Sequence, residues 1–130
     1  MTVLVEGSKI RYEIAITWMK DIEVMHIACA FDCKVPLRRQ VELRSLIALI
    51  NERLWVGHFD LWAVEGTVML RSGQVLAGGA TLSGKQCEML IAQVLDICER
   101  YYDAFQFVVW GGKSAKEALE AAMFETKGEA

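Results

Sequence analysis

The sequence predicts an α+β domain in which helices pack on an antiparallel sheet. Segments that alternate apolar and polar residues, as strands do, fall into two blocks of the chain. Short turn signals join the strands inside each block, which favours antiparallel neighbours. Segments with helical spacing of apolar residues stand between the two blocks and after the second one. The predicted order of elements is therefore β-β-β-α-β-β-α-α.

The first block contains three predicted strands. Residues 2–5 read as a short strand, and the Gly7-Ser8-Lys9 sequence as a turn. Residues 10–18 alternate strictly, which predicts a strand with one buried face. Residues 23–31 are apolar or small on both faces. We expect this third strand to be central and covered by a helix on at least one side.

The segment after Pro36 predicts an amphipathic helix that leads into a hairpin. Its apolar positions fall at i, i+3, i+4, i+7 and i+11, and they are Leu43, Leu46, Ile47, Ile50 and Leu54. The helix is expected to end at residues 55–57. Strands at 59–64 and 67–70 then flank a turn at Glu65-Gly66, and an extension of the second strand through residues 75–77 stays open.

Two capping boxes predict the last two helices. Ser83 and Gln86 have the spacing at which each side chain satisfies a free backbone donor of the other residue. The helix that they open is expected to run about 26 residues, to the Gly111-Gly112 stop. A strand at residues 105–110 is the alternative, because that segment also suits a sheet. Ser114 and Glu117 open a final short helix through about Phe124.

Composition and charge limit the classes of function. A chain of 130 residues is expected to form one domain, residues 1–130, and its 54% hydrophobic content favours self-association. No apolar run approaches the roughly 18 to 20 residues of a membrane span. The N-terminus shows no secretory signal, so we expect a cytoplasmic protein. A net charge of −3 argues against nucleic acid as the partner.

The cysteines and histidines do not form a recognisable chemical motif. Four cysteines in a cytoplasmic protein are expected to be reduced thiols. His26 and Cys29 are three apart on a predicted strand, so their side chains point to opposite faces and cannot share a metal, even with Asp32 nearby. A Cys–His nucleophilic pair stays open as an alternative. We therefore predict no metal, no cofactor and no catalytic residues.

Two long runs carry a resemblance to a known family. They are NERLWVGHFDLW at residues 51–62 and CERYYDAFQFVVWGGKS at residues 98–114, and the ending ETKGEA fits as well. These runs resemble the YbjN-like family of bacterial proteins, described as sensory transduction regulators. The resemblance implies a fold similar to type III secretion chaperones, which commonly dimerise and bind polypeptides, and it implies no catalytic residues. Relatives generally carry a helix before the first strand, whereas this sequence starts almost directly in the strand, so either an upstream segment has been removed or this member does without the helix. Relatives also tend to have a proline at the position of Asp103, which leaves a kink or break of the long helix near Tyr102 open.

The leading functional hypothesis is a non-enzymatic, homodimeric protein-interaction module with a regulatory or chaperone-like role and a protein or peptide partner. The alternatives are a small enzyme that uses a Cys or His in a cleft, and a purely structural partner subunit. If the helix before the first strand covers one sheet face in relatives, this chain exposes apolar surface there, and we expect the face to be occupied by a second subunit, a partner peptide or an upstream segment. The candidate interaction residues are Ile14, Ile16, Met25 and Ile27 on that face, followed by Trp55, Phe59 and Trp62.

Overall fold

The order of elements in the structure is the one that the sequence predicts. The computed structural model describes residues 1–129, and the side chains of Asp32 and of residues 125–129 are outside this description. The elements are β1 (Thr2–Glu6), β2 (Arg11–Met19), β3 (Val24–Lys34), α1 (Gln40–Asn51), β4 (His58–Trp62), β5 (Thr67–Val75), α2 (Gly84–Val109) and α3 (Ala115–Glu129). The α+β class is confirmed.

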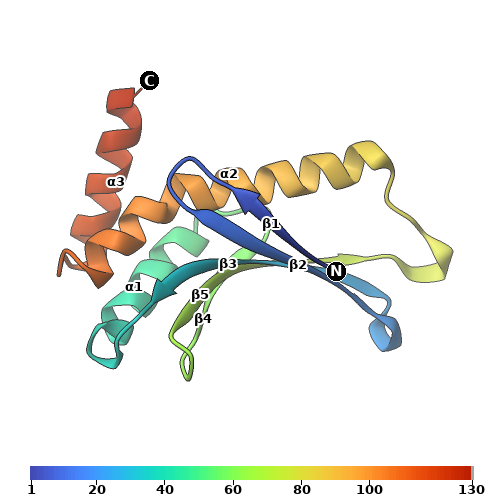
Figure 1. Ribbon diagram of the computed structural model, residues 1–130, viewed down its shortest axis with the longest axis horizontal. Helices are drawn as coiled ribbons and strands as arrows, with labels where there is room; N and C mark the ends of the chain where they lie inside the picture. Colours follow the sequence, from blue (N-terminus) through green and yellow to red (C-terminus); the bar gives the residue numbers. More distant parts are fainter. Residues whose placement is uncertain (130) are drawn as a thin grey trace.

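All five strands form one antiparallel sheet in the order β1-β2-β3-β5-β4 (Figure 1). The third strand along the chain lies in the middle, as its two apolar faces predict. β5 continues to Val75, so the open question of its extension is decided in favour of the longer strand. The longer strand matters because it lets β5 pair with most of β3.

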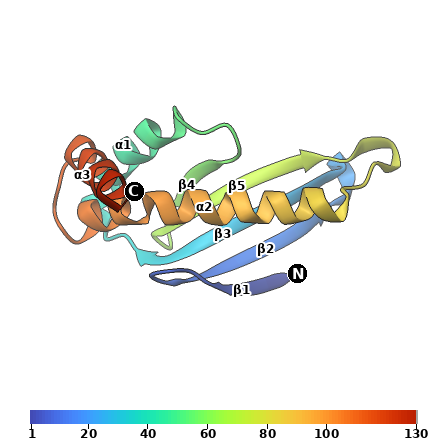
Figure 2. The same cartoon turned by 90° about the horizontal axis from the view of Figure 1, so that it is seen from above.

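One long helix covers one face of the sheet. α2 has 26 residues and runs along the strands (Figure 2). Its N-terminus has both predicted capping bonds: the Ser83 hydroxyl accepts from the backbone N–H of Gln86 at 3.1 Å, and the Gln86 side chain accepts from the N–H of Ser83 at 2.8 Å. The strand alternative at residues 105–110 is wrong, because Phe105, Val108 and Val109 continue the buried stripe of this helix.

The core lies between α2 and the sheet. Phe31, Phe59 and Phe105 meet at its centre, with edge-to-face ring contacts of 5.0 Å between Phe59 and Phe105 and 5.4 Å between Phe31 and Phe105. Such aromatic contacts add to the stabilisation from buried area. Because successive side chains alternate across a strand, Phe31 and Phe59 identify the sides of β3 and β4 that face α2.

The expected exposure of this sheet face is wrong. Ile14, Ile27 and Phe59 are 2%, 1% and 1% exposed and belong to the core. The reason is the length of α2. A helix of 26 residues spans about 39 Å, and the central strand of 11 residues spans about 36 Å, so one helix reaches along the whole strand.

α1 and α3 pack side by side at the end of the molecule where α2 finishes (Figures 1 and 2). α1 is shorter than predicted, because a 3-10 turn at Leu37–Arg39 precedes it and the helix stops at Asn51. The second capping box is present, with the Ser114 hydroxyl accepting from the N–H of Glu117 at 3.2 Å. α3 extends to Glu129, beyond the predicted end near Phe124. None of the helices in residues 1–129 has the length and apolarity needed to cross a bilayer.

Candidate functional site

The structure does not bring the seven sequence-predicted interaction residues into one surface. Three of them are core residues, as described above. Ile16 and Met25 are half-buried on the same side of the sheet, and Ile16 packs against the core. Trp62 is 48% exposed and lies on the opposite side, because it alternates with buried Phe59 along β4. Trp55 is 98% exposed in the loop between α1 and β4. Trp55 and Trp62 stay predicted contact residues.

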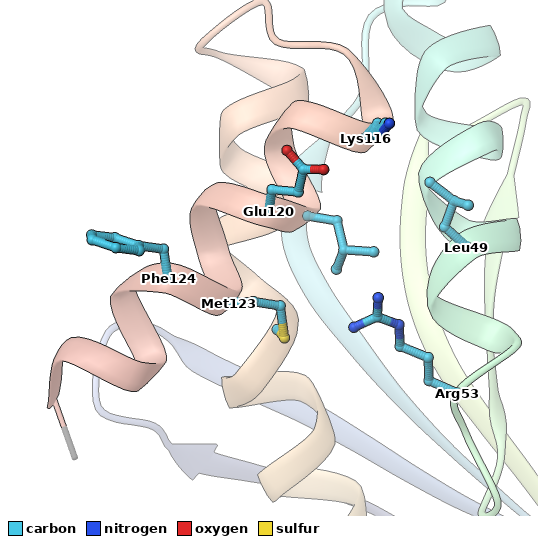
Figure 3. Close-up of a pocket in the computed structure, with 7 residues that line it drawn as sticks. Leu49, Arg53, Lys116, Glu120, Met123 and Phe124 are labelled. Carbon is cyan, nitrogen blue, oxygen red and sulfur yellow. The ribbon is translucent and has the colours of Figure 1, made fainter.

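A groove lies between α1 and α3 (Figure 3). Its volume is about 670 Å³. Figure 3 shows Leu49 and Arg53 facing α3 from α1 and from the turn after it, while Phe124 points away from α1. The full lining comprises Leu49, Arg53, Lys116, Leu119, Glu120, Met123 and Phe124. The groove thus joins two segments that lie more than 60 positions apart in the sequence.

The groove has an apolar floor and a charged rim. Leu49 and Met123 are half-buried in it, and Leu119 is only 5% exposed. Arg53, Lys116 and Glu120 are exposed at its border, and none of them forms an ion pair with another described residue. An apolar surface with unpaired charges around it has the composition of a protein contact site, where apolar anchors are buried and polar groups surround them.

Sequence reasoning did not find this groove. The helix pattern of residues 115–124 was recognised, but its partner was not, because the contact between α3 and α1 is long-range. One available signal was the change of residue type along α3. The buried stripe contains the small residues Ala115, Ala118 and Ala122, and the large residues that follow them are less buried, with Met123 half-buried and Phe124 exposed.

A polar cluster lies on the sheet face opposite α2. The Arg71 guanidinium, on β5, donates from Nε to Nε2 of His26 at 3.1 Å and from Nη1 to Oδ2 of Asp60 at 3.1 Å. His58 stands directly across from Arg71 in the pairing of β4 with β5. Burial, and after it the positive charge of Arg71 and the proximity of His58, lower the pKa of His26. His26 is therefore a neutral acceptor that helps Arg71 to link three strands.

The arrangement of thiols and imidazoles argues against a Cys–His nucleophile. Cys29 and Cys33 face α2 from β3, and Cys98 is buried on α2 itself. Cys87 is also on α2, whereas both histidines lie across the sheet. The sheet thus separates every thiol from every imidazole. No disulfide joins Cys29, Cys33, Cys87 or Cys98 in the described part of the chain.

The described residues contain no group of three or more His, Cys, Asp or Glu side chains placed to hold a metal. His26 and Cys29 point to opposite faces of β3, as their spacing predicts. The side chain of Asp32, which is close to both residues in the sequence, is outside the described part of the chain.

Comparison with known proteins identifies one family. The YbjN family, whose description reads "Putative bacterial sensory transduction regulator", matches residues 1–107. No curated protein and no solved structure shows a significant match. The matched residues include the whole sheet, α1 and most of α2. α3, which forms one wall of the groove, follows the matched residues. The family match therefore does not include the whole groove, which is seen only in the structure of this chain.

Proposed function

The chain belongs to the YbjN family of bacterial regulators, and we propose that it is a non-enzymatic regulatory module that binds a segment of another protein in the groove between α1 and α3. The observation that carries the proposal is the apolar groove floor, surrounded by charges that form no ion pair with another described side chain. Regulators act by changing the activity or availability of a partner, and a groove of this composition offers a place where a partner segment can be held.

The groove favours a particular kind of segment. Leu49, Leu119 and Met123 would receive apolar side chains, and the flexible thioether of Met123 can adapt to different shapes. Arg53 and Lys116 outweigh Glu120 at the rim, so an acidic residue beside the apolar anchors is favoured. The partner segment is therefore a short amphipathic stretch with acidic flanks.

The module is further proposed to act as a homodimer in the cytoplasm. The hydrophobic content of 54% and the exposed apolar side chains support self-association. Light scattering is expected to give about twice the chain mass of 14.6 kDa. Four cysteines without a disulfide among the described residues agree with a reducing compartment. The similarity of the fold to type III secretion chaperones is what the family resemblance implies.

A displayed library of random peptides, selected on the intact protein, tests the groove. Enriched peptides are expected to share apolar anchors beside Asp or Glu. Their affinity, measured by fluorescence polarisation, should fall roughly tenfold or more in Arg53→Glu, because a cation at the rim becomes an anion that repels the peptide. Arg44→Glu is the matched control, since Arg44 is an exposed residue of α1 that does not line the groove.

Equal affinity of the enriched peptides for wild type and Arg53→Glu would contradict the groove as the binding site. Loss of affinity in both variants would show a general effect of charge and would also contradict it. Circular dichroism on both variants confirms that the helices remain intact, because each substitution changes an exposed side chain.

A further inference from the structure

We infer that β1 pairs with β1 of a second copy of this chain, in an antiparallel register centred on Leu4, so that two sheets join into one. The inference rests on the proposed homodimer and specifies how its two copies meet. It does not depend on the groove between α1 and α3, which lies at the end of the molecule where α2 finishes. The sheet has two edge strands, β1 and β4, and they differ in how their backbone groups are protected.

The β4 edge is closed by side chains. Asn51, at the end of α1, donates from Nδ2 to the carbonyl of Phe59 at 3.2 Å, and its Oδ1 accepts from the N–H of Phe59 at 2.8 Å. The next outward-facing N–H, that of Leu61, donates to Oδ1 of Asp60 at 3.0 Å. Both outward-facing backbone groups of Phe59 and the N–H of Leu61 are thus already used, which leaves an additional strand few groups to pair with. Proteins protect sheet edges in this way against unwanted pairing.

The β1 edge is open. The N-terminal ammonium of Met1 donates to the carbonyl of Ile16 at 3.0 Å, and the N–H of Ile16 donates to the carbonyl of Met1 at 2.8 Å. Hydrogen-bonded pairs alternate in an antiparallel ladder, so Val3 and Val5 also bond to β2, and the backbones of Thr2, Leu4 and Glu6 face outward. Within the described residues, no hydrogen bond reaches these outward-facing groups from beyond the strand.

The sequence and position of β1 favour pairing. The strand contains no proline, lysine or bulge, the usual protections of an exposed edge. Leu4 is 61% exposed and Val3 41% exposed. The hairpin turn that follows is held against α2, because the backbone N–H and the hydroxyl of Ser8 donate to the Glu99 carboxylate at 2.6 and 2.8 Å. A strand that is already fixed loses little conformational freedom on binding.

The strand is also complementary to itself. A two-fold axis at Leu4 places Leu4 against the partner's Leu4, Val3 against the partner's Val5, and Thr2 against the partner's Glu6. All five residues then have partners, the outward-facing backbone groups exchange hydrogen bonds, and no like charges meet. A two-fold axis at Glu6 would instead oppose two carboxylates and shorten the overlap. Figure 2 shows β1 at the free edge of the sheet, away from α1 and α3.

Leu4→Lys is the first test. Leu4 stands across from Glu13 of β2 within the chain, so a lysine there gains an opposite charge in the monomer. In the dimer, two lysines would meet at the axis. Dimerisation, measured by light scattering over a concentration series, should weaken by roughly tenfold or more, while the melting temperature of the monomer is maintained. Val64→Lys is the control, because Val64 is 97% exposed in the turn between β4 and β5.

A disulfide cross-link is the second test. Directly opposed residues of a hydrogen-bonded antiparallel pair have Cα atoms about 5.5 Å apart, within the range that a disulfide spans. Leu4→Cys is combined with Cys87→Ser, because the other three native thiols are buried. With oxidised glutathione as the oxidant, the two introduced thiols of a dimer should lose two electrons and two protons and form a covalent dimer. Val64→Cys in the same background should react much more slowly.

The outcomes separate the two proposals. Dissociation by Leu4→Lys together with selective cross-linking at position 4 supports the β1 interface. A dimer that tolerates Leu4→Lys, or cross-linking no faster than in the Val64→Cys control, overturns it. A wild-type protein that stays monomeric at all concentrations overturns it too. Peptide binding with Arg53→Glu and Arg44→Glu then decides separately whether the groove proposal stands.

Discussion

Phe59→Ala tests whether β4 is held in the core by the aromatic contacts seen in the structure. The Phe59 side chain is 1% exposed, and its ring lies 5.0 Å from that of Phe105, 5.8 Å from that of Phe31 and 6.1 Å from that of Tyr101. Truncation to alanine removes the ring from the middle of this group. The neighbours cannot close the space, because they are fixed on β3 and α2.

The expected loss follows from the burial of the ring. Replacing a fully buried Phe by Ala costs about 3–5 kcal/mol, from lost transfer free energy and from the cavity that remains. Domains of this kind unfold with about 5–15 kcal/mol, so the change removes a large part of the total. With a urea m-value of about 2 kcal/mol per molar, the unfolding midpoint should fall by about 2 M. Trp55→Ala, at a side chain that is 98% exposed, should change stability by less than about 0.5 kcal/mol.

Urea unfolding followed by circular dichroism measures both variants against wild type. The comparison is valid where the m-value is unchanged, because the midpoint then reports stability alone. A loss below about 1 kcal/mol in Phe59→Ala would refute the reasoning, and so would equal losses in the two variants. Either result would indicate that Phe59 is a surface contact residue, as the sequence predicts, and not a core residue.

The remaining predictions concern pH and helix capping. The pKa of folded His26 lies below its unfolded value of about 6.5, so the unfolded chain binds more protons as pH falls below 6.5. The free energy of unfolding should therefore decrease as the pH falls from about 6.5 to the pKa of folded His26. This part of the decrease should vanish in His26→Gln. If urea midpoints of wild type and His26→Gln change with pH in parallel, the prediction is wrong. Ser83→Ala removes the acceptor for the N–H of Gln86 and should cost about 1 kcal/mol, with faster amide exchange confined to the first turn of α2. Faster exchange throughout α2 would show instead that the cap is not a local feature.

Local patterns in the sequence were sufficient to place most elements. The alternation in residues 10–18, the helical spacing after Pro36 and the two capping boxes depend on neighbours within a few positions, so they can be read without the fold. The capping box at Ser83 and the continuous apolar stripe to Val109 correctly predicted one helix of 26 residues. Element ends were less certain, because the 3-10 turn before α1 and the length of α3 depend on weaker local preferences.

Which surface covers which other surface was decided only by tertiary structure. The sequence correctly placed Ile14 and Ile16 on one face of a strand, but it could not show that α2 lies over that face. Strand register likewise brings Arg71 to His26 and Asp60, and a slip of one residue would send these side chains to opposite faces. The groove between Arg53 and Lys116 and the open β1 edge likewise result from contacts between segments that are distant in the sequence. Packing between distant segments depends on the apolar area that the whole chain buries, and this total cannot be calculated from a short window of sequence.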